Sequence, residues 1–139
     1  MGYMRHHAIL VTGIDFGRAE KNVSELHRAV IDEAERFGLA HLVSPLSPPA
    51  MNGHRTFTVV PDGSKEGWGE SDRGESFRRE VIDLFLSFRY QDRSSPVAWA
   101  LVQYGDDSGD NRVVWTDANW RDTPVIAGSA PKQQQQAGA

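Results

Sequence analysis

Apolar residues follow two different rhythms in the first part of the chain, and each rhythm predicts an element. Residues 8–11 form a short continuous apolar run, which favours a central strand covered on both faces. Between residues 19 and 37, apolar side chains recur every three or four positions, as on one face of a helix. Gly38 is a typical helix stop. The first predicted unit is therefore a strand followed by a helix.

The middle of the chain predicts two further strands. Residues 40–43 are a short strand candidate, and the prolines that follow make it an edge strand or an irregular crossing. Asn52-Gly53 is a strong turn signal. Residues 55–60 alternate between apolar and polar side chains, which predicts a half-buried strand that ends at Pro61.

The second half repeats the helix–strand order. A second helix is predicted over residues 73–90, with Asp72 and Glu75 at the spacing of a capping box. Residues 97–104 carry apolar side chains on both faces, which again predicts a central strand. A hairpin loop at 105–110 leads to a final strand at 112–116. The second helix takes its apolar face from Phe77, Val81, Leu84, Phe85 and Phe88.

This order, β-α-β-β-α-β plus one extra strand, predicts an α+β fold of the ferredoxin-like, split βαβ type. In that fold an antiparallel sheet carries both helices on one face. We expect a single domain over residues 1–121. Residues 122–139 are rich in Gln, Ala and Gly and are expected to form a flexible tail, with a docking peptide as the alternative.

Composition narrows the functional classes. The chain has 139 residues, 15.5 kDa and no cysteine, which excludes disulfides, Cys-ligated metals and thiol catalysis. Nineteen acidic against fifteen basic residues give a net charge of −4 and argue against direct nucleic-acid binding. No apolar run is long enough to span a membrane or to serve as a signal peptide, so a cytoplasmic location is expected.

The polar stretch 62–74 is the most unusual predicted loop, because it places Trp68 between two glycines. An exposed aromatic side chain there can close over a planar ligand or anchor a protein partner. The alternative is that the Trp folds back onto the sheet. Arginine outnumbers lysine in the chain, and four arginines are candidates for an anion-binding cluster, with ordinary surface ion pairs as the alternative: Arg55, Arg73, Arg78 and Arg79.

No motif carries a specific chemistry. The stretch 105–117 matches a calcium-binding loop poorly and suits a hairpin turn better. The histidines lack metal-binding spacing, and no serine lies in a nucleophile elbow. We therefore predict no catalytic residue, no metal and no cofactor, and we expect that the protein is not an enzyme.

Three stretches resemble a small uncharacterised family of bacteriophage and prophage proteins. They are residues 6–12, residues 61–72, and residues 94–107 with their Ser-Ser-Pro and Gln-Tyr-Gly-Asp-Asp segments. The resemblance covers roughly residues 4–118 and carries no known activity. It implies an accessory protein that binds a host component, such as a defence protein or a nucleotide signal.

The leading hypothesis is a non-catalytic, anti-defence binding protein, in one of two forms. In the first, acidic stretches at 62–75 and 106–122, with Asp106 and Asp107, meet a basic groove on a host protein. In the second, a nucleotide-like small molecule stacks on an aromatic ring while basic residues hold its phosphate. The residues expected to serve the second form are Trp68 or Tyr104 for stacking, and Arg55, Lys65 or Arg73 for phosphate.

Two alternatives belong to other classes. A metal-dependent hydrolase of a phosphorylated small molecule would use Asp106 and Asp107. A structural or virion assembly protein would associate through Phe16, Trp115 and Trp120, which neither helix face explains. A homodimer formed through sheet edges is compatible with every one of these hypotheses.

Overall fold

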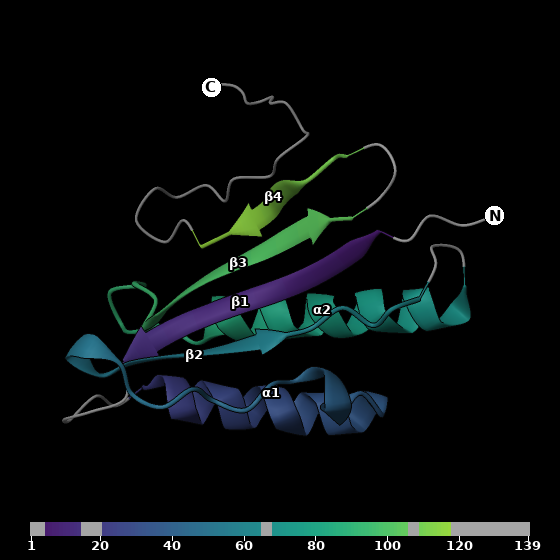
Figure 1. Cartoon of the computed structure of the whole chain (residues 1–139). Helices are drawn as coiled ribbons and strands as arrows, with labels where there is room; N and C mark the ends of the chain where they lie inside the picture. The colour runs from purple at the N-terminus through teal and green to yellow at the C-terminus, as the bar shows by residue number, and fades with distance from the viewer. Residues whose placement is uncertain (1–4, 15–20, 65–67, 106–108, 118–139) are drawn as a thin grey trace.

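The computed structural model describes residues 5–14, 21–64, 68–105 and 109–117. It contains a four-stranded antiparallel sheet and two helices that lie on the same side of it (Figure 1). The strands are β1 (His6–Ile14), β2 (His54–Val59), β3 (Val97–Tyr104) and β4 (Arg112–Thr116). The helices are α1 (Val23–Phe37) and α2 (Gly69–Ser87). The predicted α+β fold, with both helices on one face, is confirmed.

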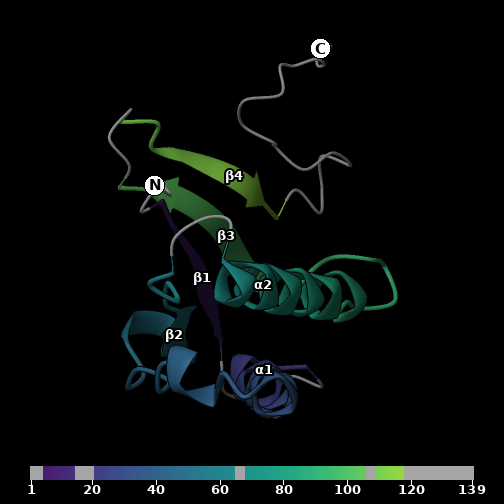
Figure 2. The ribbon, with the colours of Figure 1, turned by 90° about the vertical axis from the view of Figure 1, so that its right-hand side faces the viewer.

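The sheet order is β2-β1-β3-β4. Val43 forms an isolated antiparallel bridge to Val59, so the segment before β2 runs along its outer edge. This arrangement is the predicted split βαβ order with the extra strand at the far edge. In the view of Figure 2, α1 lies nearest β2 and α2 lies beside β1, while β4 extends beyond both helices.

The prediction of a strand at 40–43 is wrong, except that Val43 forms the single bridge to Val59. Ala40–Leu42 form a 3₁₀ turn instead, and the prolines that follow cannot donate to a ladder. Two serine side chains replace part of the ladder. Ser44 Oγ accepts from the Thr58 amide at 2.8 Å, and Ser47 Oγ accepts from the Thr56 amide at 2.9 Å. The Ser44 and Ser47 amides donate to the Thr58 and Thr56 backbone oxygens at 2.9 Å, so the outer edge of β2 is satisfied by both side chains and backbone.

Both helices begin elsewhere than predicted, and only α1 has a side-chain N-cap. The Asn22 side chain accepts from the Glu25 amide at 2.9 Å, so α1 begins at Val23, four residues later than expected. Gly38 ends it with φ +72°, as predicted. The second helix begins at Gly69 with Trp68 at the N-cap, so Asp72 and Glu75 lie inside α2 and form no capping box.

The core lies between the helices and one face of the sheet. It takes alternate residues from three strands and one stripe from each helix. The strand contributions are Ile9, Val11, Phe57, Val59, Val97 and Trp99, and the fully buried helix residues include Leu26, Val30, Phe77, Val81 and Phe85. The apolar face predicted for the second helix is therefore confirmed at its central positions.

The prediction that β1 and β3 are covered on both faces does not hold for the described part of the chain. Leu10 of β1 is 45% exposed, and Ala98 of β3 is exposed. Both strands are central in the sheet order, but the described helices cover only one of its faces. Within the described residues no helix is long and apolar enough to cross a membrane. The predicted tail at 122–139 lies outside the described residues and stays a prediction.

Candidate functional site

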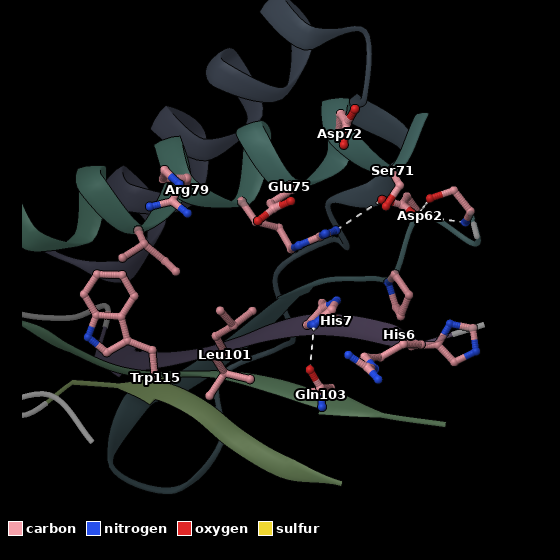
Figure 3. A pocket seen from close by; sticks show the side chains of 16 residues that line it. His6, His7, Asp62, Ser71, Asp72, Glu75, Arg79, Leu101, Gln103 and Trp115 are labelled. Carbon is pink, nitrogen blue, oxygen red and sulfur yellow. Dashed lines mark hydrogen bonds and ion pairs between the residues drawn. The ribbon is translucent and has the colours of Figure 1, made fainter. Parts of the chain in front are cut away.

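A cleft of about 520 Å³ opens between α2 and the β1, β3 and β4 strands, because α2 does not reach over the β4 edge (Figure 3). One wall is the face of α2 that carries Ser71, Glu75 and Arg79. The floor is the helix-facing side of the sheet. Proteins bind drug-sized and cofactor-sized molecules in pockets of about 300–1,000 Å³. The cleft is therefore large enough for a molecule of nucleotide size.

A polar chain of three side chains lies at one end of the floor. His7 and Gln103 are paired in the β1–β3 register, and His7 Nε2 lies 3.2 Å from Gln103 Oε1. Gln103 Nε2 donates to the Asp110 backbone oxygen at 3.0 Å and to its Oδ2 at 3.3 Å. Because the amide nitrogen faces Asp110, the amide oxygen accepts the proton of His7 Nε2. Gln103 is only 4% exposed, so this chain is a fixed part of the floor.

The same end of the cleft holds a nearly buried ion pair. Arg78 of α2 donates from Nη1 to Asp62 Oδ2 at 3.2 Å, and their side chains are 10% and 14% exposed. The other carboxylate oxygen accepts from the Ser64 amide at 2.8 Å and from Ser64 Oγ at 2.6 Å. Burial alone raises the pKa of Asp62, but the bonds from Ser64 and the Arg78 guanidinium outweigh it and lower that pKa from the ordinary 3.8. Asp62 is therefore held as a carboxylate.

Gly74 lets this carboxylate pack directly against α2. A Cβ at this position would collide with Asp62 Oδ2 and would lie 3.3 Å from Arg78 Nη1. Glycine inside a helix usually costs about 1 kcal/mol relative to alanine. Here the missing side chain makes room for the ion pair, so the glycine belongs to the site.

The other end of the cleft is apolar. Trp115 of β4 packs edge-on against Trp99, with ring centroids 5.9 Å apart. Leu101 and Ile82 line the cleft beside it. A tryptophan beside aliphatic side chains is a suitable wall for a flat ring. Trp115 was a candidate for an oligomer interface under the structural-protein alternative, and in the structure it lines this cleft.

The cleft is rich in donors. Nη1 of Arg78 is occupied by Asp62, and the described part of the chain gives its Nε and Nη2 no partner. Arg79, one residue along α2, lines the cleft with an exposed side chain. Asp72 and Glu75 balance these charges from the same helix. In the part of the chain that the structure describes, no group of His, Asp or Glu is placed to hold a metal ion.

The predicted binding residues do not meet at one place. Arg55 donates from Nε to the Ser47 backbone oxygen at 2.8 Å, beside Gly13 at one end of β1. Tyr104 is paired with His6 at the other end of β1. Arg55 and Tyr104 therefore lie about 23 Å apart along the strand. Neither residue lines the cleft.

Trp68 and Arg73 lie at the start of α2 and also do not line the cleft. Trp68 is 53% exposed, so it does not fold back onto the sheet. Arg73 donates to Glu70 Oε2 at 2.8 Å and to the Phe37 backbone oxygen at 3.4 Å. The predicted residues Lys65, Asp106 and Asp107 lie outside the described residues, as do Phe16 and Trp120.

Two residues of this cleft were predicted from the sequence, and others were missed. Arg78 and Arg79 were named as candidate anion-binding residues, and both line the cleft. Gln103 was missed, although it is a polar residue on the otherwise apolar stripe of β3 that also carries Trp99 and Leu101. A polar side chain on a buried stripe is the signal that could have pointed to it.

Comparison with known proteins leaves the chain without a close relative. No protein-family model matches it, and no curated protein is detectably similar. A structure search finds a guanylyl cyclase domain of the RhoGC fusion protein from Blastocladiella emersonii, at 12% identity and a TM-score of 0.35. The match covers 75% of this chain and 60% of that domain.

A second match is the guanylate cyclase domain of RhGC from Catenaria anguillulae in complex with GTP, at 14% identity and a TM-score of 0.35. It covers 82% of this chain and 68% of that one. Similarity at this level says nothing about what this chain binds.

Proposed function

We propose that this protein is a non-catalytic binding protein that holds a small, planar, nucleotide-like molecule with one anionic group in the cleft beside α2. The observation that carries the proposal is Arg78. It is 8% exposed and lines the cleft, and only Nη1 has a partner within the described part of the chain. A buried guanidinium with open donors is suited to a carboxylate or phosphate oxygen.

The rest of the cleft fits the same ligand class. A flat ring would lie against Trp115 and Leu101, with its anionic group directed toward Arg78 and Arg79. Asp72 and Glu75 would repel a second or third phosphate. We therefore expect a preference for one negative group over a triphosphate.

The test is calorimetric titration of the whole protein with nucleoside 5′-monophosphates and aromatic carboxylates, beside the uncharged nucleosides and inorganic phosphate. We expect the planar anions to bind more tightly than either control. Arg79→Ala removes an exposed cleft cation and should weaken binding about tenfold, or ~1.4 kcal/mol. Arg28→Ala, an exposed arginine on α1 outside the cleft, is the matched control and should change nothing. Equal weakening by both variants, or no binding of any planar anion, would contradict the proposal.

The host-protein form of the hypothesis has one supporting observation. Trp68 is 53% exposed at the start of α2, beside Glu70 and Asp72, and an aromatic side chain among acids can anchor a basic partner. Trp68→Ala should then reduce capture of a host protein and leave ligand binding in the cleft unchanged. The phage accessory role, the anti-defence activity, the cytoplasmic location and the homodimer all stay predictions of the sequence.

A further inference from the structure

The side of the sheet that faces away from the helices, called here the open face, carries an unusual set of residues. It takes alternate positions from all four strands, as the strand registers fix them. Leu10 lies between Thr58 and Ala100 near its centre. No Asp, Glu, Lys or Arg stands at any of these positions. The full set is Ala8, Leu10, Thr12 and Ile14; His54, Thr56 and Thr58; Ala98, Ala100, Val102 and Tyr104; and Val113 and Thr116, with Val60 directly after β2 and with His6 at the end of β1, where it also lines the cleft.

Large exposed apolar side chains gather on the open face. The described part of the chain has six of them, and four belong to this face: Leu10 at 45%, Tyr104 and Val113 at 40%, and Val60 at 38%. An antiparallel sheet with one wet face normally turns polar residues outward. A contiguous apolar face on a protein of this size marks an interaction surface.

Three hydroxyls of the open face, those of Thr12, Thr56 and Thr116, already have partners within the sheet. Thr12 Oγ1 and Thr56 Oγ1 form a hydrogen bond of 2.8 Å across the β1–β2 pair. Thr116 Oγ1 donates to the Trp99 backbone oxygen at 2.7 Å. Burying a hydroxyl that keeps its partner avoids most of the desolvation cost. These hydroxyls can therefore be covered without any new partner.

We propose that the open face is the contact between two copies of this chain, related by a twofold axis and packed sheet against sheet. Each copy then keeps its helices on the outside, and the two sheets lie about 10 Å apart, as in a β-sandwich. The cleft beside α2 is on the opposite side of the sheet and stays open in both copies. The inference is independent of the ligand proposed for that cleft.

Charge is the first reason to choose a second copy over another occupant. The chain has a net charge of −4, so most arrangements of two copies bring like charges together. The outer sides of the helices carry many charged residues, among them Glu25, Arg28, Glu80 and Asp83. The open face is where two copies can meet without such repulsion. Nucleic acid and anionic membranes find no cation on it.

Size is the second reason. A face four strands wide and about eight residues long measures roughly 19 by 27 Å, from about 4.8 Å between strands and 3.4 Å per residue. Two such faces bury about 1,000 Å² in total, close to the lower limit of about 1,200 Å² for stable complexes. We therefore expect a weak, concentration-dependent dimer.

The test is the mass of the whole protein in solution, measured by sedimentation velocity from about 1 µM to several hundred µM. We expect the mass to rise from the 15.5 kDa of one chain toward twice that value. Leu10→Glu places a charge at the centre of the open face and should keep the protein monomeric over the whole range. Met51→Glu is the matched control, because Met51 is 85% exposed and lies outside this face. It should dimerise like the unmodified protein.

Circular dichroism shows whether Leu10→Glu is folded. If it is not, Val113→Glu on the edge strand β4 decides the question, since an edge strand tolerates an outward charge. Loss of the dimer in either folded open-face variant, with Met51→Glu unchanged, supports the proposal. A dimer that survives the open-face charge lies elsewhere and overturns it. An unmodified protein that stays at 15.5 kDa at every concentration also overturns it.

Discussion

The two sides of the sheet differ in a way that their surroundings do not require. The helix-facing side becomes polar where His7, Gln103 and the Asp62–Arg78 pair meet, although much of this side is covered. The open side has no described helix over it and carries no charged residue. An ordinary one-sided sheet shows the reverse, with an apolar covered face and a polar free one.

This difference indicates that the two sides of the sheet are suited to different partners, a small ligand on one side and a protein surface on the other. The polar groups of the cleft are fixed by neighbours, since Ser64 and Arg78 hold Asp62, and Asp110 holds Gln103. Fixed donors are suited to a small ligand, which needs a few groups at set positions. The open face instead offers area without charge, which is suited to another protein surface. Each variant below, controls aside, changes either the cleft side or the open face of the sheet and leaves the other side unchanged.

The largest effect should come from Gly74→Ala. The added Cβ collides with Asp62 Oδ2 and forces the carboxylate away from Arg78, which leaves a nearly buried guanidinium without its ion pair. We expect a loss of about 2 kcal/mol in the free energy of unfolding, from overpacking and the broken pair together. Urea unfolding measures it.

Gly69→Ala is the matched control for this variant. Gly69 also lies in α2, but a Cβ there meets nothing within 4 Å. Alanine at this position should leave stability unchanged or raise it slightly, because alanine favours a helix. If both variants lose the same stability, helix propensity and not the Asp62 contact explains the effect.

A smaller effect on the same side should appear at low pH. The pKa of Asp62 is lower in the folded protein than in the unfolded chain, so its charge stabilises the fold at neutral pH. That contribution is lost as the pH falls below 3.8 and through the folded-state pKa. Unfolding free energies measured between pH 6 and pH 3 should therefore fall less in Asp62→Asn than in the unmodified protein.

Asp92→Asn separates this effect from a general response to acid. Hydrogen bonds from the side chain and backbone of Ser94 lower the pKa of Asp92, but this carboxyl is fully exposed. We expect Asp92→Asn to change the pH dependence of the unfolding free energy less than Asp62→Asn does. An unaltered pH dependence in Asp62→Asn would show that the ion pair does not contribute.

The smallest change belongs to the open face. Replacing Thr12 and Thr56 together by valine removes both partners of one hydrogen bond and keeps the shape of the side chains. Such paired replacements are nearly neutral, so stability should change by less than about 0.5 kcal/mol. The added apolar area should shift the sedimentation equilibrium toward dimer. A weaker dimer would mean that these hydroxyls take part in the contact.

The sequence predicted most elements because their patterns are local. The period of α1, its stop at Gly38 and the bounds of β3 at 97–104 and β4 at 112–116 all follow from neighbouring residues. The first turn of α2 was missed, because Gly69 lies in a polar, glycine-rich stretch and resembles a loop residue. The prediction of a strand at 40–43 failed because these residues form a 3₁₀ turn, and the hydroxyls and backbone amides of Ser44 and Ser47 supply the hydrogen bonds to β2 instead.

The candidate site was harder to predict for a related reason. Arg78 and Arg79 were recognisable as paired cations on one helix. The other polar groups come from distant positions, since Asp62, the partner of Arg78, follows β2 and Gln103 lies near the end of β3. Trp68 and Tyr104 were named for stacking, and neither lines the cleft, in which the tryptophan is Trp115 of β4. Aromatic residues show no local signal of which face they occupy once a bulge shifts the register, as it does between Leu101 and Val102.

The sequence by itself determined the elements, their order and the apolar character of both faces of β1 and β3. Those properties depend on side-chain spacing along a single strand or helix, which is visible in one dimension. Only the tertiary structure decided which face the helices cover, that Asp62 meets Arg78, and that the cleft opens beside β4. These depend on which distant segments come together, because packing and pairing join residues that no local pattern connects.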